Sequence, residues 1–207
     1  MDGKKENKKI LLSRLGLTYN ENTPLIAMVS RISIQKGFDL VLEAMDNLLK
    51  QNLQIYILGD GDRSLVEKLY EYRDKYPEKF AMSLSSDEKM VHLVEAGADI
   101  LLMPSKYEPC GLQQIYSLRY GTIPIVSAVG GLFDTVDDLD VETGEGTGFI
   151  LEQLSAKSIV KAVKKAVAYY KKKEQWAELQ KRIMEEDFSW ELSAKRYLDV
   201  YSRALNE

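Results

Sequence analysis

The chain has 207 residues, with 45% hydrophobic and 29% charged residues and a formal net charge of -4 at pH 7. This length suits one large domain, and this composition is typical of a folded globular protein. The negative net charge argues against a general nucleic-acid-binding protein, because binding a phosphate backbone needs a basic face.

Three further features indicate a cytoplasmic protein. The single cysteine, Cys110, excludes an internal disulfide and fits a reducing compartment. No apolar run reaches the roughly 18 residues that a membrane-spanning helix needs. The charged start, MDGKKENKKI, is not followed by the apolar core of a secretory signal peptide.

Short apolar runs of strand length alternate along the chain with segments of helical periodicity. In chain order, the first predicted elements are a short helix ending near Gly16, a strand at 23–30, a helix at 38–51, a strand at 53–59 and a helix at 64–76. A strand at 79–84, a helix at 86–97, a strand at 98–104, a helix at 111–121 and strands at 123–128 and 146–151 follow. The remainder is helical. The predicted caps are Ser64 with Glu67, Ser155 and Ser189.

The predicted strands are nearly continuous apolar runs rather than alternating ones. Such runs are typical of a parallel sheet that is covered by helices on both faces. Right-handed crossovers then give an α/β fold with a Rossmann-like, doubly wound parallel sheet. We expect a linker and short helix at 1–22, the Rossmann-like domain at 23–186 and a separate C-terminal helix at 187–207.

Polar residues and glycines follow four of the predicted strands. Ligands bind beyond the carboxyl ends of the strands in an open parallel sheet, so these residues are expected to share one edge. They are Arg31 and Lys36 after the first strand, Gly59 after the second, Glu108, Cys110 and Gly111 after the fourth, and Gly130, Gly131 and Thr135 after the fifth.

These residue types indicate a nucleotide-sugar site. Backbone N–H groups at a helix start bind phosphate, and glycine lets a ligand approach the backbone closely. The turns Cys110–Gly111–Leu112 and Gly130–Gly131–Leu132 are therefore candidate phosphate sites. Arg31 and Lys36 supply cations for phosphate oxygens. Glu108 repels phosphate, so its expected partner is neutral and rich in hydroxyl groups, as a sugar is.

Each of these features also has an ordinary structural explanation. Gly59 makes a tight turn, and Arg31 or Lys36 alone would be a surface charge. The prediction therefore depends on four loops meeting at one sheet edge. His92 is the only histidine and has no cysteine beside it for a metal site, and Cys110 has no recognisable base partner for nucleophilic catalysis.

Four segments resemble a known enzyme family. They are SRISIQKGFDL, LGDGD, AGADILLMPSKYEPCGLQQIYSLRYGTIPIVSAVGGLFDTV and FSWELSAKRYLDVY. From about residue 8 to residue 203, the sequence resembles the C-terminal half of bacterial glycogen synthases and plant starch synthases. These are retaining glucosyltransferases of family 5, with the two-domain GT-B fold. They transfer glucose from ADP-glucose to the non-reducing end of an α-1,4-glucan.

The resemblance implies a role for each candidate residue. Arg31 and Lys36 match the residues that hold the diphosphate of ADP-glucose, and Glu108 matches the carboxylate that binds the hydroxyls of the donor glucose. The Cys110–Gly111–Leu112 turn matches backbone N–H groups that meet the sugar and phosphate. Thr135 matches a position that lies close to the distal phosphate in the family, beside the backbone of Gly130, Gly131 and Leu132. The family needs no metal or other cofactor, and a plant member would lie in the plastid.

The sequence departs from the family pattern in two respects. An aromatic residue that stacks on adenine in many bacterial members corresponds to about Ser86, which bears on the preference for ADP over UDP. The family's amino-terminal domain, with most of the glucan acceptor site, has no counterpart here. We therefore expect the isolated chain to bind nucleotide weakly and to be nearly inactive. The C-terminal helix, which crosses to that domain, would expose residues such as Trp190 and Tyr197 and favour self-association.

Three alternatives remain at this point. One is another retaining GT-B glycosyltransferase that uses a UDP- or GDP-sugar, although those enzymes usually have a second glutamate where this chain has Tyr116. Another is a non-catalytic nucleotide-sugar-binding domain, which would not need the leaving-group cations Arg31 and Lys36. A dehydrogenase is disfavoured because no GxGxxG motif follows the first strand.

Overall fold

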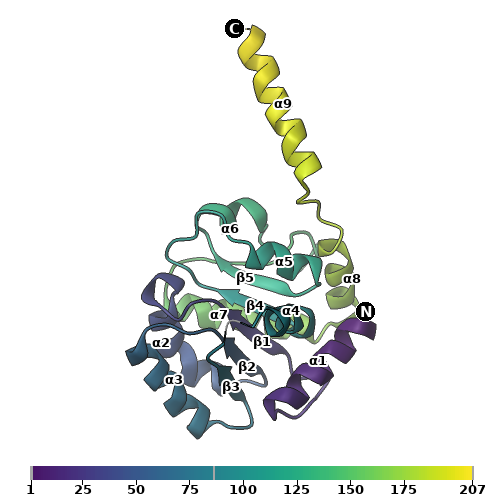
Figure 1. Ribbon diagram of the computed structural model, residues 1–207. Coiled ribbons are helices and arrows are strands. Elements are labelled where there is room, and N and C mark those ends of the chain that lie inside the picture. Colours follow the sequence, from purple (N-terminus) through teal and green to yellow (C-terminus); the bar gives the residue numbers. More distant parts are fainter. Residues whose placement is uncertain (1, 86, 207) are drawn as a thin grey trace.

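A six-stranded parallel sheet lies at the centre of the computed structural model, which describes residues 2–85 and 87–206 (Figure 1). All the strand pairings within this sheet are parallel, and the strands lie in the order β3-β2-β1-β4-β5-β6. The direction of winding reverses between β1 and β4, so the predicted doubly wound sheet is confirmed. The strands are β1 (Leu25–Val29), β2 (Gln54–Leu58), β3 (Phe80–Ser83), β4 (Ile100–Met103), β5 (Ile123–Ser127) and β6 (Phe149–Leu151).

Helices cover both faces of this sheet. One face carries α2 (Phe38–Leu49), α3 (Arg63–Lys75) and α7 (Ala156–Tyr170). The other carries α1 (Asp2–Leu15), α4 (Glu88–Gly97), α5 (Gln113–Arg119) and α6 (Gly130–Thr135). The 3-10 turn η1 (Ile34–Lys36) precedes α2, and α8 (Lys173–Ile183) follows α7 and packs on both α7 and α5.

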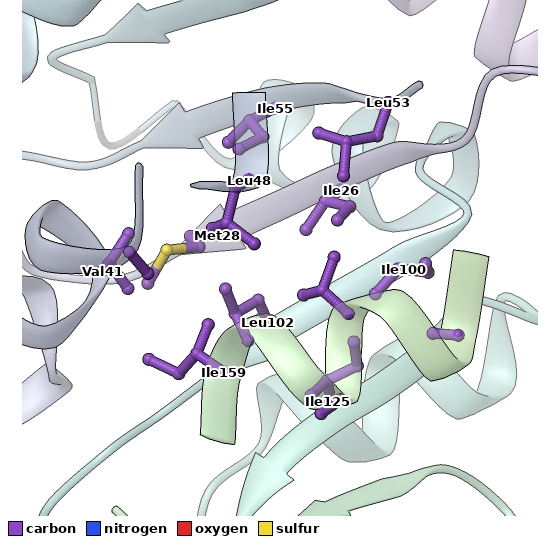
Figure 2. Packing of buried hydrophobic residues seen from close by; sticks show 14 of the residues in the cluster. Ile26, Met28, Val41, Leu48, Leu53, Ile55, Ile100, Leu102, Ile125 and Ile159 are labelled. Carbon is purple, nitrogen blue, oxygen red and sulfur yellow. The ribbon is translucent and has the colours of Figure 1, made fainter. Parts of the chain in front are cut away.

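The apolar strands divide their side chains between two cores. In β1, Ile26 and Met28 join the core under α2 and α7, whereas Leu25, Ala27 and Val29 join the core under α1 and α4. Successive side chains of a strand point to opposite faces, so a strand covered on both faces is apolar throughout. Figure 2 shows part of the first of these cores, where labelled side chains of β1, β2, β4 and β5 lie beside side chains of α2 and α7.

Helix caps show where local prediction succeeded and failed. The predicted cap at Ser64 is wrong, because the Asp62 carboxylate accepts hydrogen bonds from the N–H groups of Ser64 and Leu65 and α3 begins one residue earlier. The predicted caps at Ser155 and Ser189 are confirmed, since their hydroxyl oxygens accept from backbone N–H groups three residues on. The short helix α6 was not predicted as a helix.

The last helix, α9 (Trp190–Asn206), projects away from the sheet domain (Figure 1). Its apolar side chains are open to solvent, with Trp190 84%, Tyr197 61% and Tyr201 60% exposed. Within the described residues, no helix is long and apolar enough to cross a membrane.

We expect this exposed face to make the chain self-associate, because burying apolar area is favourable. Light scattering should show an average mass that rises with concentration. Replacing both Tyr197 and Tyr201 by lysine should lower that mass, whereas Asp199→Lys on the same helix should not. A single, monomeric mass at high concentration would refute the hypothesis.

Candidate functional site

A cavity of about 610 Å³ opens at the carboxyl edge of the sheet, beside the switch point between β1 and β4. It is lined by residues that follow β1, β2 and β3, together with the connection from β4 to α5. Of the residues predicted from the sequence, those that line it are Arg31, Lys36, Gly59, Glu108, Gly111 and Leu112. Those that do not line it are Cys110, Gly130, Gly131, Leu132 and Thr135.

Lys36 and Glu108 form an ion pair in this cavity. The Lys36 Nζ donates to Glu108 Oε2 at 2.5 Å, and the Lys36 and Glu108 side chains are only 24% and 11% exposed. The Ser105 hydroxyl donates to the same carboxylate oxygen at 3.3 Å. Because the pair is shielded from solvent, its attraction is screened less than that of a surface pair. A phosphate that binds Lys36 must therefore compete with Glu108.

The backbone around Gly37 brings these two side chains together. Gly37 ends η1 in the left-handed region, at φ +77, and a side-chain carbon there would overlap the carbonyl oxygen of Pro104. The N–H of Lys106 donates to the carbonyl of Gln35 at 2.8 Å. The turn that carries Lys36 thus lies directly against the β4–α5 connection that carries Glu108.

Arg31 and Gly59 lie where β1 and β2 end. The Arg31 side chain is exposed and faces the cavity. Beyond Arg31, the backbone of Ile32 bonds to Asp60 and Asp62, which fixes this end of β1. Gly59 has φ +151, and a side-chain carbon there would overlap the carbonyl oxygen of Ser30. Gly59 therefore permits the close approach of the two strand ends.

The turn at the start of α6 is joined to the β4–α5 connection. The N–H of Gly131 donates to the carbonyl of Glu108 at 3.1 Å, and that of Leu132 donates to the carbonyl of Val129 at 3.1 Å. The Thr135 hydroxyl donates to the carbonyl of Gly131 at 2.5 Å. These predicted phosphate-binding groups are bonded within the protein. To bind phosphate, they would have to exchange these partners.

Sequence reasoning missed two features of the site. Ser105, which donates to Glu108, is buried at the end of β4, and its carbonyl accepts from Ser127. Leu84, which follows β3, and Val91, on α4, form an apolar wall of the cavity. The predicted adenine-stacking position, Ser86, lies outside the described residues. In the described part of the chain, no three histidine, cysteine, aspartate or glutamate residues are grouped to hold a metal ion.

His92 lies on α4 and does not line the cavity. Its Nδ1 lies 3.1 Å from Glu95 Oε2, and its ring packs near that of Tyr120. Glu95 is fully buried, and its Oε1 has no hydrogen-bond partner among the described residues. Burial raises the pKa of Glu95 above its usual range, while His92 partly offsets the rise. These contacts are structural.

Replacing Glu95 by methionine should stabilise the chain at neutral pH. A raised pKa in the folded state means that this carboxyl contributes stability only while protonated, and the contribution is lost as pH rises through the folded-state pKa. Removing the orphaned oxygen should raise the thermal midpoint by about 2–6 °C at pH 7.5. The gain should shrink as pH falls towards about 4.5, below which both states are protonated. Melting curves of this variant across that pH range, with Glu71→Met at an exposed position of α3 as control, test this; a constant gain would contradict it.

A family model described as glycosyl transferases group 1 matches residues 13–182, which include every element that lines the cavity. The chain belongs to this family. As a member of glycosyl transferases group 1, it has the six-stranded parallel sheet of a GT-B C-terminal domain, as the sequence predicted.

Similar proteins of this family are glycogen and starch synthases. The glycogen synthase of Lactobacillus acidophilus is 46% identical over 202 residues, which are 98% of this chain and 42% of that protein. The glycogen synthase of Thermotoga maritima is 43% identical over 201 residues, 97% of this chain and 41% of that protein. The catalytic domain of starch synthase IV from Arabidopsis thaliana, bound to ADP and acarbose, matches with a TM-score of 0.87 and 32% identity. It covers 99% of this chain and 43% of that one.

These comparisons confirm the predicted resemblance to glycogen and starch synthases. The chain spans less than half the length of each of these relatives.

Proposed function

We propose that this chain is the donor-binding part of a glycogen or starch synthase. The enzyme transfers glucose from ADP-glucose to the non-reducing end of an α-1,4-glucan, with retention at the transferred carbon. The observation that carries this proposal is the meeting of two cations, Arg31 and Lys36, with Glu108 in one cavity at the switch point. The glycogen synthase relatives support the proposed class of enzyme, and the ADP bound to starch synthase IV supports an ADP-linked donor.

The two kinds of charge suit the two ends of a nucleotide sugar. Arg31 and Lys36 neutralise the diphosphate, whose negative charge grows as it leaves the sugar. The Glu108 carboxylate accepts hydrogen bonds from sugar hydroxyls, which a phosphate would not supply. The apolar wall of Leu84 and Val91 faces the same cavity and suits a base.

The acceptor glucan is expected to bind mainly through residues outside this sequence. This expectation follows from the resemblance. It also follows from coverage, because the chain covers only 42% of the Lactobacillus acidophilus enzyme. We propose that the chain alone binds nucleotide but transfers little glucose.

Calorimetric titration with ADP, UDP and ADP-glucose tests the proposal. We expect ADP and ADP-glucose to bind and UDP to bind more weakly. Preference for UDP would favour the rival donor class. No binding of any nucleotide, by this chain or by the enzyme that contains it, would contradict the proposed donor site.

The ion pair makes a further prediction for Glu108→Gln. Loss of the carboxylate frees Lys36 for phosphate, so ADP should bind about 3–10 times more tightly, as expected when a competing ion pair of about 1 kcal/mol is removed. The extra affinity that the glucose of ADP-glucose provides should fall by roughly tenfold or more, because a charged acceptor is lost.

A remote ion pair provides the control for this titration. Glu152→Gln removes the partner of Lys161, and neither residue lines the cavity, so this variant should change neither affinity. If Glu108→Gln leaves ADP affinity unchanged or lower, the competition between phosphate and Glu108 does not occur.

A further inference from the structure

Gln114 is a fully buried residue in the first turn of α5. Its Nε2 lies within hydrogen-bond distance of three acceptors, the carbonyls of Cys110 and Gly111 at 3.2 and 2.9 Å and the Thr135 hydroxyl at 3.2 Å. Cys110 and Gly111 belong to the turn before α5, whereas Thr135 ends α6. One carboxamide therefore connects the two turns that the sequence predicts to bind phosphate.

The surroundings of Gln114 are arranged for an amide. Gly111 has φ +71, and a side-chain carbon there would overlap the Gln114 carboxamide, so the glycine leaves room for it. The Gln114 Oε1 has no hydrogen-bond partner among residues 2–85 and 87–206. A methionine would fill a similar volume without burying an unpaired oxygen. The hydrogen bonds that the Gln114 side chain makes with the described residues are those of its Nε2.

These contacts continue to Glu108. The Thr135 hydroxyl donates to the carbonyl of Gly131, and the Gly131 N–H donates to the carbonyl of Glu108. Gln114 thus closes a ring of hydrogen bonds that joins the β4–α5 connection to α6. Neither turn can move without breaking one of these bonds or moving the backbone of Glu108.

We propose that Gln114 is a positioning residue that holds the 108–111 turn and α6 as one unit, which sets the distal-phosphate end of the donor site. This inference rests on the proposed donor-binding function. The carboxamide does not line the cavity, so it acts through the backbone of Gly111 and through Thr135 rather than by touching the donor.

Gln114→Met tests the proposal by removing the donors while keeping an apolar side chain of similar size. Hydrogen exchange of the Gly131 N–H, followed by NMR, reports whether α6 still holds the Glu108 carbonyl. Calorimetry with ADP and AMP reports the distal phosphate alone. We expect exchange to accelerate about tenfold and ADP affinity to fall about tenfold, while AMP affinity changes less than about twofold.

Two further variants separate positioning from loss of stability. Thr135→Val removes the hydroxyl that accepts from Gln114 and donates to the carbonyl of Gly131. It should lower the ratio of ADP affinity to AMP affinity, as Gln114→Met does. Gln180→Met removes another buried glutamine, whose Nε2 donates to the carbonyl of Gly121 at 2.7 Å on the opposite side of the domain from the cavity. It should lower the melting temperature without changing either the Gly131 exchange rate or the ADP-to-AMP ratio.

Exchange at Gly131 as slow in Gln114→Met as in the parent chain would overturn the proposal. Faster exchange with an unchanged ratio of ADP affinity to AMP affinity would show that the 108–111 turn and α6 do not position the distal phosphate, which would overturn that part of the proposal. If the parent chain and the enzyme that contains it bind neither nucleotide, the proposed donor function fails. The exchange data still decide in that case whether Gln114 holds the two turns together.

Discussion

Replacing Lys36 by alanine is expected to remove most ADP binding by this chain. In the enzyme that contains the chain, the same change should lower turnover more than donor affinity. The reason is that charge on the departing diphosphate grows in the transition state, where a fixed cation stabilises it most. Loss of one such group costs about 100–1,000-fold in turnover. Arg31→Ala should act in the same direction.

The measurement is calorimetry with ADP on the chain, followed by steady-state kinetics with ADP-glucose on the whole enzyme. Lys106→Ala is the matched control, because Lys106 lies on the same connection as Glu108 but pairs with Asp39 at 2.6 Å and does not line the cavity. If Lys36→Ala weakens donor affinity and leaves turnover intact, Lys36 has no role in stabilising the leaving group.

Gly37→Ala should both destabilise the fold and damage the site. Its backbone is left-handed, and its new carbon would overlap the Pro104 carbonyl. The backbone strain of about 1–2 kcal/mol and the overlap together should cost about 2–5 kcal/mol. Relief of the overlap moves the β4–α5 connection away from η1, so Lys36 and Glu108 should separate and ADP affinity should fall.

Gly16→Ala measures the backbone-strain part of the stability loss expected for Gly37→Ala. Gly16 has a similar φ of +68, but nothing lies within 4 Å of the added carbon. It should cost only the strain of about 1–2 kcal/mol and leave ADP affinity unchanged. Denaturant unfolding of both variants measures the two losses. Equal losses would show that the Pro104 carbonyl moves aside freely.

The parallel sheet and many of the residues at its carboxyl edge could be predicted, because short stretches of sequence indicate them. A strand such as LIAMV is apolar on both faces only when helices cover both, which specifies a parallel sheet. The rule that ligands bind at the carboxyl ends of strands then placed Arg31, Lys36 and Glu108 at one edge, where the structure has them.

Features that depend on long-range contacts were not predictable in this way. Lys36 and Glu108 are 72 positions apart, so no local pattern indicates that they touch. The N–H of Gly131 looks free in the sequence, but the chain folds the Glu108 carbonyl onto it. The N-cap of α3 also could not be predicted, although the two candidate residues are only two positions apart. Asp62 and Ser64 are both good capping residues, and only the path of the preceding turn decides between them.

The ion pair of Lys36 and Glu108 gives the site a form of selectivity that neither residue has alone. A free phosphate ion would have to draw Lys36 away and leave a carboxylate without its counter-charge. A free sugar would have to draw Glu108 away and leave an ammonium group in the same position. A molecule that carries both a diphosphate and a sugar replaces both lost partners at once. In the proposed donor site, we therefore expect a ligand with both a diphosphate and a sugar to bind better than a fragment with only one of them, because the fragment leaves one buried charge without its partner.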